Sequence, residues 1–267
     1  MKTLQRVLIV APHPDDESLA AGGLIQRVTA AGGSVRVLFV TEGENNPWPQ
    51  RLLHRRWFIG DEDRKRWGTL RRAEAERSLA RLGVAATATD RLGLPDHGLL
   101  GLARSNDPRL GQALARAVAE YAPTLVVSPS AFDLHDDHRT VSWSLHTILR
   151  DTGVPVVTYI IHGSAAPSRL EHTLHLTTQE RLHKEAAIRC HETQLLLSER
   201  RFLSYATAVE RFYRDEYDCP ALESPWTTLA NRLRHAALVL REGLASAPAS
   251  GRASPLAGTP AATAQKP

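Results

Sequence analysis

Short apolar runs alternate along the chain with longer stretches that carry apolar residues at helical spacing. A run that is apolar at every position, as at residues 7–10, is typical of a strand covered on both faces of a parallel sheet. Residues 18–31 predict a helix that ends at Gly32-Gly33. Further strands are predicted at residues 35–40, 87–92, 124–128 and 154–161, and further helices at 70–82, 110–121, 140–150 and 179–192, the last capped by Thr177 or Thr178.

This alternation predicts one α/β domain of Rossmann-like type, a mostly parallel sheet with helices on both faces. The segment that follows, up to about residue 244, is expected to be mostly helical, so the domain spans residues 1–244. Residues 245–267 are mostly Ala, Ser, Pro, Gly and Thr with almost nothing to bury, and they predict a disordered tail.

Residues 41–67 break the pattern, and a loop of this length is more often functional than idle. The loop holds three tryptophans, Trp48, Trp57 and Trp67. A basic cluster runs through and beyond it, against Asp61, Glu62 and Asp63: Arg51, Arg55, Arg56, Arg64, Lys65, Arg66, Arg71 and Arg72. The cluster could favour an anionic substrate, a lipid head group or nucleic acid. We expect the cluster to form a solvated surface, and we expect no nucleic-acid partner.

Composition narrows the class of protein only slightly. The hydrophobic fraction of 42% and the net charge of +4 are ordinary for a globular protein. The two cysteines, Cys190 and Cys219, form no CxxC pair and are expected to be packing residues in a reducing compartment. Since no signal peptide and no run of about 18 apolar residues is found, we expect a cytoplasmic protein without stable membrane insertion.

Two polar clusters follow predicted strands, where open α/β sheets place their ligands. The first is Ala11-Pro12-His13-Pro14-Asp15-Asp16-Glu17, and the second is His135-Asp136-Asp137-His138. Taken singly, a histidine could be a packing residue, Asp15-Asp16 could cap a helix, and histidines three apart recur by chance. Two such clusters at two strand ends of one fold favour a site.

The residue types in the two clusters are those of a catalytic metal centre. Such a centre takes about three protein ligands and leaves a position for water. His13, Asp16 and His138 would supply them, for one Zn²⁺ per chain, although Fe²⁺ or another divalent metal also suits two nitrogens and one oxygen. Asp15 is then free to act on the bound water, and His135 would stand opposite as a second polar group.

The two clusters resemble the LmbE-like, or PIG-L, family of zinc-dependent N-deacetylases. The resemblance extends over about residues 5–215 and includes Arg71-Arg72-Ala73-Glu74 before Leu82-Gly83-Val84, Leu94-Pro95-Asp96, and Lys184 with His191-Glu192-Thr193-Gln194. It implies a hydrolase that removes the acetyl group from an N-acetylglucosamine-type sugar conjugate. Family substrates include glycosylated inositols, thiol cofactor precursors, glycolipids and antibiotic sugars.

The resemblance also implies a role for each site residue. His13, Asp16 and His138 match the zinc ligands, Asp15 the general base and acid, and protonated His135 the group that stabilises the oxyanion. Asp137 would hold His135 in its charged state or cap the helix.

Arg71 and Asp96 match positions that touch sugar hydroxyls, although Arg71 could instead pair with Glu74 on its own helix. Some relatives carry a tyrosine where this chain has Asp133, so a tyrosine contribution to the oxyanion site is not expected here. The loop at residues 41–67 matches nothing in the family pattern. We expect it to line the entrance and to select an aromatic, lipid or anionic aglycone.

Other functions stay open at this point. The metal site could hydrolyse a non-sugar N-acyl amide or a phosphoester, since the His135-Asp136 dipeptide is similar to that of HD phosphohydrolases, which are all-helical. A non-catalytic sugar- or nucleotide-binding Rossmann-like domain is a further alternative, but the GxGxxG loop is missing and Gly22-Gly23 falls within a predicted helix. The sequence does not predict the oligomeric state.

Overall fold

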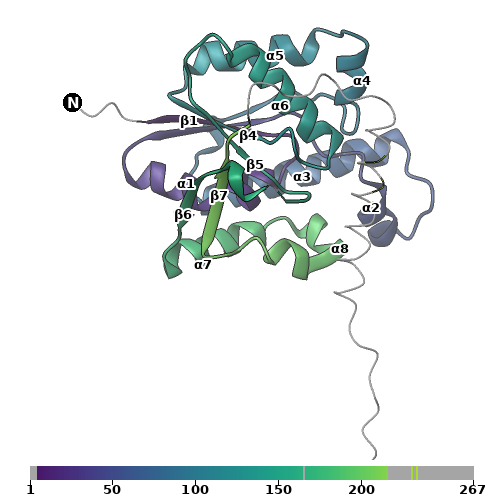
Figure 1. The fold of residues 1–267 in the computed structure, drawn as a ribbon. Coiled ribbons are helices and arrows are strands. Elements are labelled where there is room, and N and C mark those ends of the chain that lie inside the picture. The colour runs from purple at the N-terminus through teal and green to yellow at the C-terminus, as the bar shows by residue number, and fades with distance from the viewer. Residues whose placement is uncertain (1–4, 165, 216–229, 231–232, 234–267) are drawn as a thin grey trace, which may run out of the picture.

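The chain builds a twisted, mostly parallel sheet whose seven strands run in the order β3-β2-β1-β4-β5-β7-β6 (Figure 1). The computed structural model describes residues 5–164, 166–215, 230 and 233. Its strands are β1 Arg6–Ala11, β2 Ser34–Phe39, β3 Thr89–Arg91, β4 Leu125–Pro129, β5 Val156–Tyr159, β6 Leu170–His175 and β7 Val209–Tyr213. Its helices are α1 Asp16–Ala30, α2 Pro47–His54, α3 Asp61–Arg81, α4 Leu99–Arg104, α5 Arg109–Tyr121, α6 Asp136–Leu149, α7 Thr178–Ile188 and α8 Glu192–Leu203.

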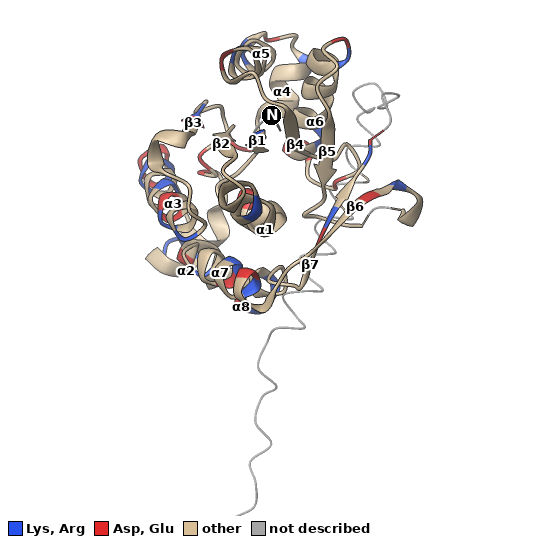
Figure 2. Cartoon of the chain, turned by 90° about the vertical axis from the view of Figure 1, so that its left-hand side faces the viewer, with Lys and Arg blue, Asp and Glu red and all other residues tan. Residues whose placement is uncertain are grey.

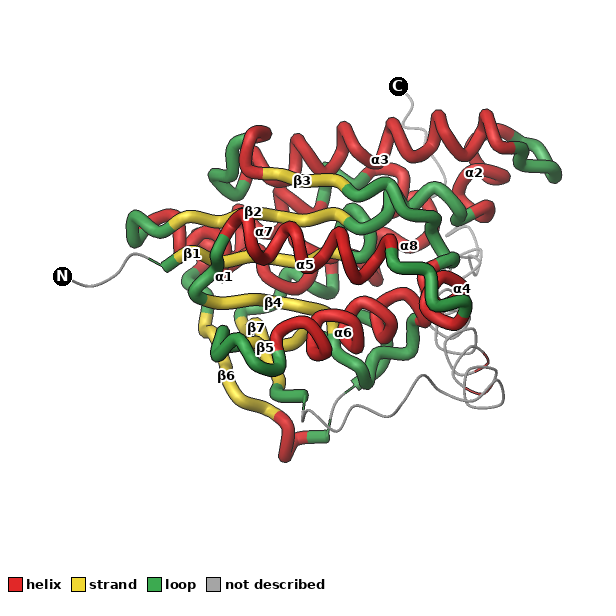
Figure 3. Tube along the Cα trace, turned by 90° about the horizontal axis from the view of Figure 1, so that it is seen from above, coloured by secondary structure: helices red, strands yellow, loops and turns green. Residues whose placement is uncertain are grey.

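Strand β1 lies at the centre of the parallel part, paired with β2 on one side and β4 on the other. Its side chains alternate between two cores: Val7 and Ile9 face α1, α3 and α7, whereas Leu8 and Val10 face α4, α5 and α6. Figures 1 and 3 show these two helical layers on opposite faces of the sheet. The predicted Rossmann-like architecture is therefore confirmed.

The antiparallel edge made by β7 and β6 was not predicted. Strand β7 pairs antiparallel with β5 and β6, and it lies in a segment that we expected to be helical. Residues 162–176 carried no prediction, yet they contain β6, whose side chains are mostly exposed. A short edge strand with little to bury has a weak alternation of apolar and polar residues, so its sequence pattern does not reveal it.

Other predicted boundaries also move. The loop at residues 41–67 contains the helix α2 and the first two turns of α3, because Asn46 and Gly60 start helices within a polar stretch. The helix expected at 179–192 ends at Ile188, and a separate α8 follows. Thr177 is the N-cap of α7 and accepts from the backbone N–H of Glu180, as predicted.

Some expectations fall outside the described residues. These are the tail at 245–267, the domain boundary at 244 and Cys219. The thiol of Cys190 is half-buried and donates to the carbonyl of Ala186, which fits a packing residue. No helix among the described residues has the length and apolar character needed to cross a membrane.

Candidate metal centre and active site

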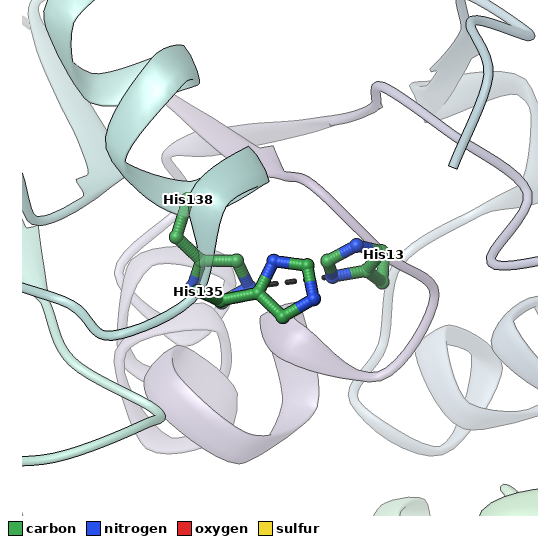
Figure 4. Close-up of side chains that lie close together, drawn as sticks. All are labelled: His13, His135 and His138. Atoms are coloured by element: carbon green, nitrogen blue, oxygen red, sulfur yellow. Dashed lines mark hydrogen bonds between the residues drawn. The ribbon is translucent and has the colours of Figure 1, made fainter. Parts of the chain in front are cut away.

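The predicted ligands His13, Asp16 and His138 converge at the carboxyl ends of β1 and β4. His13 Nδ1 lies 3.3 Å from Asp16 Oδ2 and 3.3 Å from His138 Nε2, and His138 Nε2 lies 3.2 Å from the same Asp16 oxygen. Figure 4 shows the two imidazoles facing each other, with His135 beside them. A tetrahedral ion with bonds of about 2.0–2.1 Å separates its ligand atoms by about 3.3–3.4 Å. The three donor atoms therefore fit a small divalent ion such as zinc.

The charges around these donors are tightly paired. Burial alone would lower the pKa of His138, yet the neighbouring carboxylates of Asp16 and Asp133 raise it to about 10. Burial would likewise raise the pKa of Asp16, but His138 and His13 hold it well below its usual range. The Asp16 carboxylate thus lies between two imidazoles that favour a proton, and a metal ion bound there would take the place of those protons.

Asp15 lies next to the donor atoms but points its carboxylate elsewhere. It is the N-cap of α1 and has a φ of 141°, an uncommon conformation for a residue with a side chain. Its backbone N–H donates to Oε2 of the fully buried Glu17, at 2.9 Å. Burial raises the pKa of Asp15 to about 6, against the opposing charge of Arg71. A carboxylate with this pKa can both accept and return a proton near neutral pH.

Arg71 contacts Asp15, and the alternative pairing with Glu74 is not observed. Its Nη2 donates to Oδ2 of Asp15 at 2.9 Å, and its Nη1 donates to the carbonyl of Gly43, also at 2.9 Å. Gly43 has a φ of 63°, and a Cβ there would lie 1.7 Å from the guanidinium. The carboxylate of Glu74 instead accepts from Thr193. The buried Arg71 is therefore positioned to hold Asp15 as well as to line the pocket.

The relation expected between Asp137 and His135 takes a different form. His135 is the N-cap of α6, and its Nδ1 accepts from the backbone N–H of Asp137 at 3.2 Å, so His135 and not Asp137 caps the helix. The carboxylate of Asp137 accepts from the backbone N–H groups of His97 and Leu99 and lies 3.4 Å from His13 Nε2. Burial and the neighbouring histidines hold the pKa of His135 well below its usual range. The carboxylate of Asp137 thus faces His13 and its backbone N–H faces His135, and the role of Asp137 in holding a charged His135 stays a prediction.

Asp96 lies beside His13 and lines the pocket. Its Oδ1 is 3.2 Å from His13 Nε2, and its Oδ2 accepts from the backbone N–H of Asn45. Its position links the loop after β3 to the loop after β2, which explains how two distant segments meet at one strand end.

A pocket of about 550 Å³ opens over these residues. Its lining includes the site residues His13, Asp15, Asp16, Arg71, Asp96 and His135, together with Asn45, Trp48, His97, His162, Gln194 and Arg201. A volume in this range is that of an ordinary small-ligand site. Trp48 is the one tryptophan of the predicted loop that lines this pocket in the described structure, because Trp57 is 78% exposed elsewhere and Trp67 is buried in the protein.

Comparison with known proteins agrees with this geometry. The family model described as "PIG-L: GlcNAc-PI de-N-acetylase" matches residues 8–149, more than half of the chain. The chain belongs to the PIG-L family. The resemblance seen in the sequence is confirmed, and the matched region holds all the predicted site residues.

Two bacterial proteins that are similar in sequence to this chain are named 1D-myo-inositol 2-acetamido-2-deoxy-alpha-D-glucopyranoside deacetylase. The Rhodococcus jostii protein is 32% identical over 54% of this chain and 51% of its own length. The Mycobacteroides abscessus protein is 27% identical over 74% of this chain and 84% of its own length. The chain thus spans only about half the length of some curated relatives that it matches.

A solved structure supports the PIG-L fold. The N,N'-diacetylchitobiose deacetylase from Pyrococcus horikoshii superposes with a TM-score of 0.59 and 19% identity, covering 84% of this chain and 88% of that one. At this identity the likeness is evidence for the fold alone.

Two polar groups of this PIG-L site were not assigned a role from the sequence. Asp133 is fully buried and contacts His138 Nδ1 at 3.1 Å. His162 lines the pocket and its Nδ1 lies 2.9 Å from Nη2 of Arg201. A histidine directly after the predicted strand at residues 154–161 was the available signal for His162, since that strand also ends at the active edge of the sheet.

The basic cluster largely follows the expectation of a solvated surface. Arg64, Lys65 and Arg66 pair with Asp61, Glu62 and Asp63 one turn away on α3. Figure 2 shows the acidic and basic residues interspersed along this helix. Arg71 is the exception, because it is buried at the site.

Asp215 holds the loop that carries Asp133 through hydrogen bonds. Its buried carboxylate should make the stability of the folded protein depend on pH. Its carboxylate accepts from the Ala131 N–H at 2.7 Å and the Ser130 hydroxyl at 2.9 Å. Burial would raise its pKa, but the nearby His146, 3.8 Å away, and hydrogen bonds from Ala131 and Ser130 keep it below the usual range. A carboxylate whose pKa is lower in the folded state stabilises the folded protein at pH values above its unfolded pKa of about 4. That contribution is lost as the pH falls through the pKa of the folded state.

We therefore expect Asp215→Asn to lower the free energy of unfolding by about 1–3 kcal/mol at pH 7. The difference from the wild type should narrow below about pH 4, as the wild-type carboxylate takes up its proton. Urea unfolding of both proteins at pH 7 and pH 3 measures this. An equal difference at both pH values would contradict the assigned role of the charge.

Proposed function

We propose that this chain is a metal-dependent hydrolase that removes the acetyl group from an N-acetylglucosamine-type sugar conjugate, giving acetate and a free amino sugar. The observation that carries the proposal is the triangle of donor atoms on His13, Asp16 and His138, with the carboxylate of Asp15 beside it in an open pocket. The deacetylase names of the PIG-L relatives support the same reaction.

The proposed mechanism assigns each proton to a residue. A divalent ion held by His13, Asp16 and His138 would act as a Lewis acid and make a bound water acidic near neutral pH. Asp15 takes a proton from the water that attacks the acetyl carbonyl, and returns it to the departing amine nitrogen. The Nε2–H of His135 donates to the developing oxyanion, since Nδ1 is already engaged by Asp137. Water is consumed, and acetate and the amine are released.

Zinc is the proposed metal because its catalytic sites favour this combination of two imidazoles and one carboxylate. Iron(II) or another divalent ion fits the same donors. Asp137 supports the reaction indirectly in this proposal. Its carboxylate lies beside His13, and its backbone N–H donates to His135, but it does not touch the reacting atoms.

Recognition of the sugar is proposed for Arg71 and Asp96, which line the pocket. Trp48 lies at the same pocket and offers an aromatic face to the aglycone, so an aromatic or apolar aglycone is the expected preference. The partner is thus a small glycoconjugate. A cytoplasmic location is part of the proposal, since the use of cysteine in the chain suits a reducing compartment.

The test is acetate release from a panel of N-acetylglucosamine glycosides, with zinc-loaded and chelator-treated protein side by side. We expect release that disappears with the metal and returns when zinc is restored, with a ranking among aglycones. If no glycoside yields acetate, while non-sugar N-acyl compounds or phosphomonoesters are hydrolysed in a metal-dependent way, the proposed substrate class is wrong.

A further inference from the structure

The two imidazoles of the donor triangle face it with opposite ring nitrogens. His13 presents Nδ1 and His138 presents Nε2. Behind His138, Nδ1 lies 3.1 Å from Oδ2 of Asp133. Behind His13, Nε2 lies 3.2 Å from Asp96 and 3.4 Å from Asp137. Each imidazole is thus placed between the donor triangle and a buried carboxylate.

These carboxylates bear on which ring nitrogen of each histidine carries the proton. A neutral imidazole carries one proton, so a nitrogen that binds a metal through its lone pair forces the proton onto the other nitrogen. That N–H is buried here and needs an acceptor, and a carboxylate that accepts it fixes both the tautomer and the ring orientation. The same argument excludes a second ion between His13, Asp96 and Asp137, because His13 Nε2 cannot both carry its proton and bind a metal.

Asp133 is held more rigidly than an ordinary loop carboxylate. Its Oδ1 accepts from the backbone N–H of His135 at 2.8 Å. Its Oδ2 accepts from those of Ile161 at 2.8 Å and His162 at 3.1 Å. These groups come from the loop before α6 and from the end of β5, so Asp133 joins two elements at the active edge of the sheet. The three N–H donors keep the buried carboxylate ionised and leave it little freedom to turn.

We propose that Asp133 is a positioning residue that fixes His138 in the tautomer presenting Nε2 to the metal, and that the charges of Asp96 and Asp137 near His13 Nε2 favour the opposite tautomer of His13. This inference rests on the proposed metal site and deepens it.

The test measures zinc affinity by competition with a chromophoric chelator, in the absence of substrate. We expect Asp133→Asn to bind zinc about 10–100-fold more weakly than the wild type. The matched control is Asp215→Asn, which also removes a buried carboxylate charge that accepts a backbone N–H in the loop before α6, without contacting His138. Asp215→Asn should lose stability and keep the wild-type zinc affinity.

A spectroscopic readout separates positioning from general destabilisation. Long-range ¹H–¹⁵N spectra of zinc-loaded wild type should show His138 with Nδ1 protonated and His13 with Nε2 protonated, and the His138 pattern should change in Asp133→Asn. The inference is overturned if Asp133→Asn keeps wild-type affinity, if both variants lose affinity equally, or if wild-type His138 carries its proton on Nε2. The wild-type spectrum tests which ring nitrogens bind the metal, and the comparison with Asp133→Asn tests the role of Asp133. Because none of these readouts needs a substrate, failure of the deacetylase reaction would be recognised separately.

Discussion

Asp15→Asn is expected to lower kcat/KM for acetate release by about 10²- to 10⁴-fold, the usual contribution of a general acid–base group. The amide keeps the size of the side chain but cannot take the proton of the attacking water. Asparagine also tolerates positive φ better than most residues, so the unusual backbone of residue 15, at φ 141°, can be retained. Kinetics on the best glycoside of the panel, with metal content measured for each preparation, tests the expectation.

Two features make this substitution informative. The metal content should stay at one ion per chain, because Asp15 is not among the three proposed ligands. Asp61→Asn is the matched control, since Asp61 is exposed and forms an ion pair with Arg64 on the surface of α3, away from the pocket residues. It should leave kcat/KM unchanged. If Asp15→Asn retains wild-type kcat/KM at full metal loading, another group must move the proton and the mechanism above is wrong.

Lys184→Met is expected to lower the free energy of unfolding by about 3–5 kcal/mol. Lys184 Nζ lies 2.7 Å from Oε1 of Glu210, and both side chains are almost fully buried. Glu210 also accepts from the backbone N–H groups of Gly23 and Leu24, just after the helix α1 is interrupted at Ala21. Removal of the lysine leaves a buried carboxylate without its counter-ion, in contact with the helix that begins at the metal site.

Urea unfolding of three variants tests this. The double variant Lys184→Met with Glu210→Gln should recover part of the lost stability, because no charge is then left unpaired. Lys65→Met makes the same substitution in a pair whose side chains are each 74% exposed, and it should leave the unfolding transition in place. Equal effects of Lys184→Met and Lys65→Met would show that the buried pair has no special role.

The local sequence determined the parallel part of this fold and the position of its active edge. Continuous apolar runs such as residues 7–10 specify buried strands, and the polar residues after them must lie at the carboxyl edge of a parallel sheet. The pattern alone therefore predicts that His13, Asp15, Asp16 and the pair His135 and His138 share one site. It does so because the parallel direction of the strands places their carboxyl ends at one edge of the sheet, independently of how the side chains pack.

Only the tertiary structure decided which side chains meet within that site. Arg71 contacts Asp15 and not Glu74, Asp137 faces His13 and not the ring of His135, and Asp133 lies behind His138. Each partner comes from a different loop, and sequence spacing carries no information on contacts between loops. The antiparallel strands β6 and β7 escaped prediction for a related reason, since each is defined by the neighbours that it pairs with. The pattern of polar residues along the chain can therefore locate a site, whereas the partner that each charged side chain contacts depends on tertiary packing.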